Sequence, residues 1–492
     1  MASGGKASAL RIDGTRRETG GASRWSVLGG LTLVTFLLLA DDTAVSVAVP
    51  TIQTDLGAGF VSISWVVKTY TLAVAAFTLL AGRLADRNGA RPIFLLGLAV
   101  FVLGSLLGGL APNAAVLIAA RGVQGLGAAL VAPAALALIA STFPDRERGV
   151  AIGIWSGVSA SALGAGPLFG AIITDWVGWP WIFLVNVPLG AGAWLLARFL
   201  LPRSTHVRTG GGVDLPGVAL SAVALVALVM SLGLFEDGGW ASPGFLALLL
   251  VSFASALLFI ARERRARLPL VDLRLFRSRS LTGANLVTLL STAVMCSLFF
   301  FLALYLQTVA GLSALAAGGA LLPLTLSIVV VAPIAGRLAD RFGNRLLIVV
   351  GMLALAVALL GLGTLGLRSG GIALAAWLAL AGIGIGIART PTTSAALSGA
   401  DGSAYGMAAG ILNTAQATGL ALGIAVMSVI LTSFGPNAAF DRTLDAAHHE
   451  AFVDGLTAAL AVNAGIAAAA ALLAAVLLGP RAPRPADRCA HC

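Results

Sequence analysis

The sequence predicts an all-α integral membrane protein with fourteen transmembrane helices, and three observations carry this prediction. Hydrophobic residues make up 58% of the 492-residue chain and charged residues only 11%, whereas ordinary soluble domains carry about 25% charged residues. Fourteen segments are long and apolar enough to cross a bilayer, which takes about 20 residues each. The basic residues gather on alternate connections between these segments, as the positive-inside rule requires.

The fourteen apolar segments follow one another with short polar connections. Their approximate limits are 27–49, 61–82, 92–110, 114–140, 149–173, 181–201, 215–235, 243–261, 281–309, 315–338, 346–367, 371–395, 405–434 and 455–478. Residues 1–24 precede the first segment and are polar, so we expect an N-terminal tail rather than a signal peptide.

The formal net charge of +10 is a topology signal rather than a sign of a nucleic-acid partner. Of the 31 lysines and arginines, all but five lie on one set of alternate connections, which we expect to be cytoplasmic. The five exceptions are Lys68, Arg121 and Arg389 within segments, and Arg368 and Arg442 on the opposite side. Both the N-terminal tail and the tail at 481–492 are therefore predicted to be cytoplasmic, in a protein of the cell inner (plasma) membrane.

An internal repeat sets the domain organisation. Residues 82–91 read GRLADRNGAR and residues 336–345 read GRLADRFGNR, and duplicated halves are typical of secondary transporters. The distance between the copies leaves room for two extra segments, so the helices are arranged 6+2+6. The predicted parts after the N-terminal tail are a six-helix bundle (25–203), two central helices (204–265), a cytoplasmic interfacial linker (266–279), a second six-helix bundle (280–480) and the C-terminal tail.

The repeated loop resembles a signature of the major facilitator superfamily, in its fourteen-span drug:proton antiporter branch. The matching residues are Gly82, Asp86, Arg87, Gly89 and Arg91, and in the second copy Gly336, Asp340, Arg341, Gly343 and Arg345. The resemblance implies a major facilitator fold in which this loop is a conformational latch. Physically, glycines permit a tight reversal, and the Asp86 carboxylate suits a helix N-terminus or an arginine. The alternative is a solvated basic turn.

Charged residues within the predicted helices are the candidate machinery. Arg121 lies in IAARGVQGLGAA, which resembles the family motif R-x-x-q-G, and a buried guanidinium needs an acidic or strongly polar partner. Asp41 and Asp42 lie in DDTAVSVAVP, which resembles the first-span motif of the family. Counting 1.5 Å per residue places these groups and Lys68 at similar depths. We therefore expect an Asp–Asp–Lys–Arg cluster to be geometrically feasible.

Such a cluster suits proton coupling, because two adjacent carboxylates near cations can bind protons at widely separated pH values. Our hypothesis from the sequence is that Asp41 is a protonation site and that Arg121 tunes it. The alternative is a static salt-bridge network that only orders the helices. Lys68 would favour an anionic or neutral substrate, or would simply neutralise one of the aspartates. Arg389 lies near the inner end of its helix, where we expect it to snorkel to water.

The fifth segment contains SASALGAGPLFGA, which resembles the antiporter motif of the family through Gly166, Pro167 and Gly170. The resemblance implies an exporter, and the alternative is packing of small residues against a neighbouring helix. Three further family markers, at 179–190, 269–281 and 305–323, are interpreted as packing or interfacial elements.

These observations predict a secondary active transporter and no enzyme: a proton-driven exporter of small amphipathic compounds, working by alternating access. A Walker A loop is absent, and GLGTLG at 361–366 lies inside an apolar segment, so neither ATP hydrolysis nor a dinucleotide is expected. We expect no metal and no cofactor besides the coupling proton, the bilayer as partner, and a monomer. The alternatives are a proton-coupled importer or exporter of one metabolite, and a membrane sensor that does not transport.

Overall fold

The protein is helical throughout the part of the chain that the computed structural model describes. The described residues are 24–201, 214–238, 242–266, 269–312, 314–364, 371–398, 404–434 and 446–479. The two expected tails, apart from Arg24, lie outside these residues.

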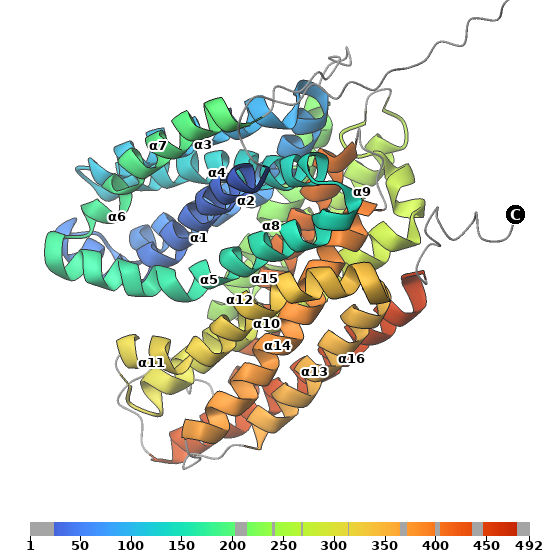
Figure 1. The fold of residues 1–492 in the computed structure, drawn as a ribbon. Coiled ribbons are helices and arrows are strands. Elements are labelled where there is room, and N and C mark those ends of the chain that lie inside the picture. The colour runs from blue at the N-terminus through green and yellow to red at the C-terminus, as the bar shows by residue number, and fades with distance from the viewer. Residues whose placement is uncertain are drawn as a thin grey trace, which may run out of the picture.

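The N-terminal half is a bundle formed by the first seven helices (Figure 1). They are α1 (Arg24–Asp55), α2 (Phe60–Asn88), α3 (Ala90–Gly109), α4 (Ala114–Thr142), α5 (Asp145–Val177), α6 (Pro180–Leu184) and α7 (Asn186–Leu200). Its helices form because long apolar runs leave the backbone no hydrogen-bond partners in lipid except its own.

Two central helices and a second bundle follow. They are α8 (Leu215–Gly238) and α9 (Pro243–Glu263), the 3-10 helix η2 (Leu273–Arg277), and then α10 (Arg279–Thr308), α11 (Ala314–Ala320), α12 (Leu322–Phe342), α13 (Asn344–Gly363), α14 (Gly371–Ser398), α15 (Tyr405–Phe434) and α16 (Ala446–Leu477). Helices α8 and α9 pack mainly on each other, and α8 also packs on α2 of the first half and on α15 of the second.

The fold class predicted from the sequence is confirmed. Thirteen helices in the described residues are long and apolar enough to span a membrane, and α5, bent by 42° between Ala162 and Ala165, brings the number to fourteen. Two predicted segments differ in detail. The segment at 181–201 is divided between α6 and α7, and the segment at 315–338 between the short α11 and α12.

The two halves converge at one end of the molecule and diverge at the other (Figure 1). The converging end carries both copies of the repeated loop, and we call it the arginine-rich end. There α2 packs against α15, and α5 against α12. Because both of these helix pairs are packed together at this end, the structure represents a conformation that is closed on the arginine-rich side.

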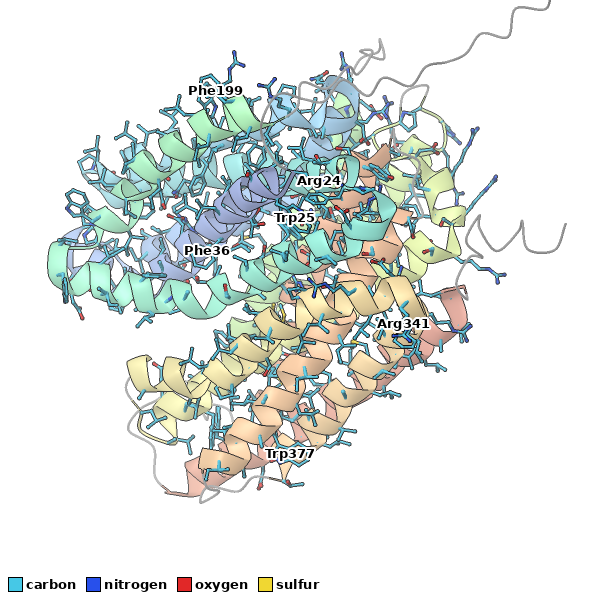
Figure 2. The ribbon with its side chains drawn as sticks, in the orientation of Figure 1. Arg24, Trp25, Phe36, Phe199, Arg341 and Trp377 are labelled. Carbon is cyan, nitrogen blue, oxygen red and sulfur yellow. The ribbon has the colours of Figure 1, made fainter. Side chains whose placement is uncertain are left out.

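Large apolar side chains cover the outside of the bundle, as expected for a protein in contact with lipid. Phe199 on α7 is 82% exposed and lies at the periphery in Figure 2. Within the C-terminal half, Arg341 and Trp377 lie at opposite ends (Figure 2). Trp377 contacts Gly361 of α13 at the end remote from the repeated loops.

Candidate functional site

A buried cluster of charged side chains joins α1 to α4 in the N-terminal half. One guanidinium nitrogen of Arg121 lies 2.8 Å from Asp41, and the other terminal nitrogen lies 2.8 Å from Asp42. The side chains of Arg121 and Asp41 are fully buried, whereas that of Asp42 is 30% exposed. The two carboxylates thus share one cation, and the ionised cluster carries one negative charge.

Arg121 is held in place by α2 as well as by the two aspartates. Its Nε donates to the carbonyl of Val66 at 3.2 Å, and its Nη1 also donates to Gln124 at 3.0 Å. The guanidinium carbon lies 4.3 Å from the centre of the Tyr70 ring, a cation–π distance. These contacts satisfy a side chain that cannot lose its proton and that would otherwise be very costly in this position.

Asp41 and Asp42 have different surroundings. Asp41 accepts hydrogen bonds from Asn186, at the start of α7, and from Gln124 at 3.4 Å, in addition to its contact with Arg121. Gln124 also donates to Ser105 of α3 at 2.7 Å. Asp42 has Arg121 as its partner and keeps a solvent-accessible edge. Asp41 is therefore the enclosed member of the pair and Asp42 the accessible one.

Lys68 does not join this cluster, contrary to the four-residue arrangement considered from the sequence. It is exposed and lines a cavity of about 170 Å³ between α2 and α8, with Gly233 on the opposite wall. Val66 and Tyr70, which contact Arg121, lie on the other face of α2. The depth in the membrane that is estimated from the sequence groups Lys68 with the aspartates. The position of Lys68 around the axis of α2, however, directs its side chain toward the central helix α8.

The antiporter-motif residues of α5 pack directly on the segment of α1 that carries the aspartates. A Cβ atom at Gly166 would overlap Thr43 and the carbonyl of Ala40, and one at Gly170 would lie 2.5 Å from the carbonyl of Ala44. Pro167 lies between the two glycines, just after the bend in α5. The bend in α5, together with the lack of a Cβ atom at Gly166 and Gly170, allows α5 to approach α1 closely.

The first copy of the repeated loop connects the two halves. Asp86, at the end of α2, accepts hydrogen bonds from the backbone N–H groups of Gly406 and Met407 at 2.6 and 2.7 Å. Both belong to the first turn of α15, where the helix dipole favours a carboxylate. Gly82 packs against Gly406, and a Cβ atom at Gly82 would lie 2.5 Å from the Gly406 carbonyl. The role of Gly82 is thus a helix crossing and not the reversal expected from the sequence.

The second copy makes the equivalent crossing between α12 and α5. Gly336 packs against the backbone of Gly149, and Asp340 lies beside Gly149 in the first turns of α5. The reversal in each copy is made by the later glycine, because Gly89 and Gly343 have φ values of 92° and 86°. Side chains with a Cβ atom rarely adopt this backbone conformation.

The arginines of the repeated loops lie at the same end but have different partners. Arg91 donates to the carbonyl of Arg198, at the end of α7. Arg341 lies over the ring of Phe342 at 5.3 Å. Arg87 is half-buried and Arg345 is exposed. Arg148 of α5 adds a contact between the halves, because it lies 5.4 Å from the centre of the Tyr405 ring.

Sequence reasoning missed Asn186, Tyr70 and Ser105 as members of the charged cluster. Asn186 belongs to the marker WPWIFLVNVPLG at 179–190, which was interpreted as a packing element. The signal that points to Asn186 as a member of the cluster is its polar amide, which lies inside an apolar segment and inside a family marker. Arg389 also differs from expectation. It is only partly exposed and donates to the Met295 sulfur at 3.6 Å, inside the C-terminal half.

Comparisons with known proteins agree with this architecture. A family model described as the Major Facilitator Superfamily matches residues 31–214 and 215–424. The human organic anion transporter MFSD10 (TETRAN) superposes with a TM-score of 0.62 at 16% sequence identity, covering 92% of this chain and 100% of that one. At this identity the likeness shows a shared fold.

Several curated proteins are similar over most of the chain. The puromycin resistance protein pur8 of Streptomyces alboniger is 36% identical over 482 residues, which is 96% of this chain and 95% of that protein. The tetracenomycin C resistance and export protein of Streptomyces glaucescens is 36% identical over 83% of this chain and 76% of its own length. The methylenomycin A resistance protein of Streptomyces coelicolor is 36% identical over 80% and 82%. The chain therefore belongs to the major facilitator superfamily, among relatives that are named as antibiotic resistance and export proteins.

Proposed function

We propose that this protein exports small amphipathic compounds across the plasma membrane in exchange for protons, by alternating access of its two six-helix halves. The names of the relatives support export of antibiotic-like compounds. The shared cation of Asp41 and Asp42 supports proton coupling, and it is the observation that carries the proposal. Two carboxylates that compete for one guanidinium leave one negative charge, which a single proton neutralises.

Within this proposal, Asp42 exchanges the proton and Asp41 remains the counterion of Arg121. Asp41 is enclosed and accepts hydrogen bonds from two amide side chains besides Arg121. Asp42 is 30% exposed, so a proton from the solvent reaches it before it reaches the fully buried Asp41. Protonation of Asp42 removes its attraction for Arg121 and so changes the contact between α1 and α4.

The energy of one proton is sufficient for concentrative export. A charge that crosses 100 mV releases about 2.3 kcal/mol, which corresponds to a concentration ratio of about fifty for a neutral substrate. The coupling also has a route to the rest of the fold, because α5 packs on α1 beside the aspartates and on α12 at the arginine-rich end.

The experiment uses full-length protein in inside-out liposomes with an imposed pH gradient and puromycin as the first probe. An exporter concentrates the probe in an acidic lumen, whereas a proton-coupled importer removes it. We expect Asp42→Asn to abolish accumulation driven by the gradient while exchange of labelled for unlabelled probe continues. Asp55→Asn is the matched control, because Asp55 lies at the end of the same helix, and its side chain accepts a single hydrogen bond among the described residues, from Trp179.

The expected result for the control is accumulation at the level of the unmodified protein. Full accumulation by Asp42→Asn, in the presence of a gradient that an uncoupler abolishes, would contradict the assignment of Asp42. If no anionic, neutral or cationic probe moves in either direction, although the probes bind, the protein is a sensor and the proposal is wrong.

A further inference from the structure

A large cavity at the arginine-rich end lies outside the charged cluster and outside the contacts of the repeated loops. Its volume is about 680 Å³. It is open on one side and is lined by the end of α9, by Val271 and by η2, and its remaining walls are Leu79 of α2 and Ile411 and Thr414 of α15. We call it the arginine-lined cavity, because Arg264, Arg274 and Arg277 are among its lining residues.

The three arginines of this cavity are not neutralised by any residue in the part of the chain that the structure describes. None of them forms an ion pair with any residue that the structure describes, and all three are exposed. The neighbouring acids have other partners. Asp214 binds Arg262 at 2.9 Å, Glu263 accepts the Val271 N–H at 3.2 Å, and Asp272 accepts the Arg274 backbone N–H at 2.9 Å.

Apart from Thr414 of α15, the rest of the lining is apolar. Phe259 and Ile260 of α9, together with Ile411 of α15, form a hydrophobic wall behind the arginines. A soluble anion would use the guanidinium groups and leave this wall unfilled, and a neutral drug would leave the guanidinium groups without a counterion. A ligand with an anionic head and an apolar tail satisfies both parts. Basic pockets between helices at a membrane surface are suited to anionic lipid headgroups.

We propose that the arginine-lined cavity binds an anionic phospholipid, with the phosphate between the three arginines and an acyl chain against Phe259 and Ile260. The walls come from both halves of the molecule, and Ile411 lies little more than one turn along α15 from Gly406, which caps Asp86. The site exists in this form only while α2 and α15 remain together. Bound lipid therefore favours the conformation that is closed at the arginine-rich end.

The test is lipid binding to the full-length protein, measured by native mass spectrometry after titration with phosphatidylglycerol or with phosphatidylcholine of the same acyl chains. We expect phosphatidylglycerol to be retained in preference. The double variant Arg274→Gln, Arg277→Gln should bind it about 10- to 30-fold more weakly, as expected for two arginines next to an anionic headgroup. The matched control is Arg265→Gln, Arg279→Gln, which removes two charges from the same region but not from the cavity lining.

A second variant keeps the charges and removes the space. Ala256 lines the cavity, so Ala256→Trp should fill it and reduce lipid retention although every arginine is present. Equal retention of the two lipids, or an equal loss in the control double variant, would overturn the proposal. Displacement of the lipid by millimolar inorganic phosphate would show a site for a free anion instead. Because binding is measured without transport, the outcome is independent of the proposed function.

Discussion

The interiors of the two halves differ sharply in their charge, although the halves share a fold and a repeated loop. In the N-terminal half, Arg121 is fully buried and pairs with two aspartates. In the C-terminal half, Arg389 is partly buried, and its contact is the sulfur of Met295 at 3.6 Å, with no ion pair among the described residues. A sulfur atom is a weak acceptor. The duplicated scaffold thus holds an ionic group with one excess negative charge in the N-terminal half and, in the C-terminal half, a cation without an ion-pair partner among the described residues.

This difference teaches that the helices of the two halves are equivalent while their chemistry is not. The paired charges order five helices of the N-terminal half, namely α1, α2, α3, α4 and α7. Arg389 orders no such network. We therefore expect substitutions at the two arginines to have opposite consequences for folding.

The largest expected effect separates the two arginines directly. Arg121→Gln leaves Asp41 buried without its cation, and breaking a buried ion pair in this way costs about 3–5 kcal/mol. Arg389→Gln removes a charge that has no carboxylate partner, so the thermal unfolding temperature should stay the same or rise. Unfolding of both purified variants in detergent, followed by tryptophan fluorescence, measures the difference. Equal destabilisation by the two substitutions would contradict the difference in charge pairing between the two halves.

The second prediction concerns a feature that the halves have in common. Gly89→Ala and Gly343→Ala each force a side chain into a backbone conformation with φ near 90°, which costs about 1–3 kcal/mol. The two variants should lose similar amounts of stability in the same fluorescence assay. Gly465→Ala is the control, because a Cβ atom added to this helical glycine would have no other atom within 4 Å. A loss confined to one of the two loops would show that the repeat is not structurally equivalent.

The third prediction compares the two latch carboxylates. Asp86→Asn weakens the cap on α15, a contribution of about 0.3–1 kcal/mol and up to about 2 kcal/mol when partly buried. It should open the arginine-rich end more often, so that a cysteine placed there reacts faster with a maleimide. Asp340→Asn in the second copy tests whether both crossings contribute. Unchanged labelling in Asp86→Asn would mean that the glycine packing alone holds this end closed.

The smallest expected effect concerns the ion pair between Asp214 and Arg262, which lies outside the interiors of the two halves. The hydrogen bonds from Arg262 hold the pKa of Asp214 below its ordinary value. The stabilisation is therefore complete above the ordinary pKa of an aspartate and is lost as the pH falls through the lowered value. Acid unfolding of Asp214→Asn should show a flatter pH dependence than that of the unmodified protein below pH about 4. An identical acid profile would show that this surface pair does not contribute.

The fold was predictable because membrane helices are encoded locally, in runs of apolar residues and in the placement of arginines on alternate connections. Two exceptions are instructive. Pro180 and Pro323 fall near the starts of spans that the structure divides or shortens, and only packing decides where such a helix resumes. The bend in α5 was predictable from Pro167, which removes a helix hydrogen bond, but the helix that packs on Gly166 was not, because no local pattern specifies that neighbour.

The candidate site was predictable in part. The pairing of Arg121 with Asp41 and Asp42 followed from a buried cation's need for an acid and from equal depth. Depth alone does not specify the face of a helix, which is why Lys68 was placed with them and lies elsewhere. The partner of Asp86 on α15 is more than 300 residues away in the sequence, so the capping geometry was predictable but its location was not.

The bent helix α5 has a mechanical consequence. Gly149 near its start rests on α12, and Gly166 beyond its bend rests on α1 next to the aspartates. The two contact points are about 25 Å apart along α5, at 1.5 Å per residue. Helix α5 therefore links the crossing at the arginine-rich end directly to the segment of α1 that carries Asp41 and Asp42. In the alternating access that we propose, α5 is the element through which a movement at one membrane surface reaches the aspartates.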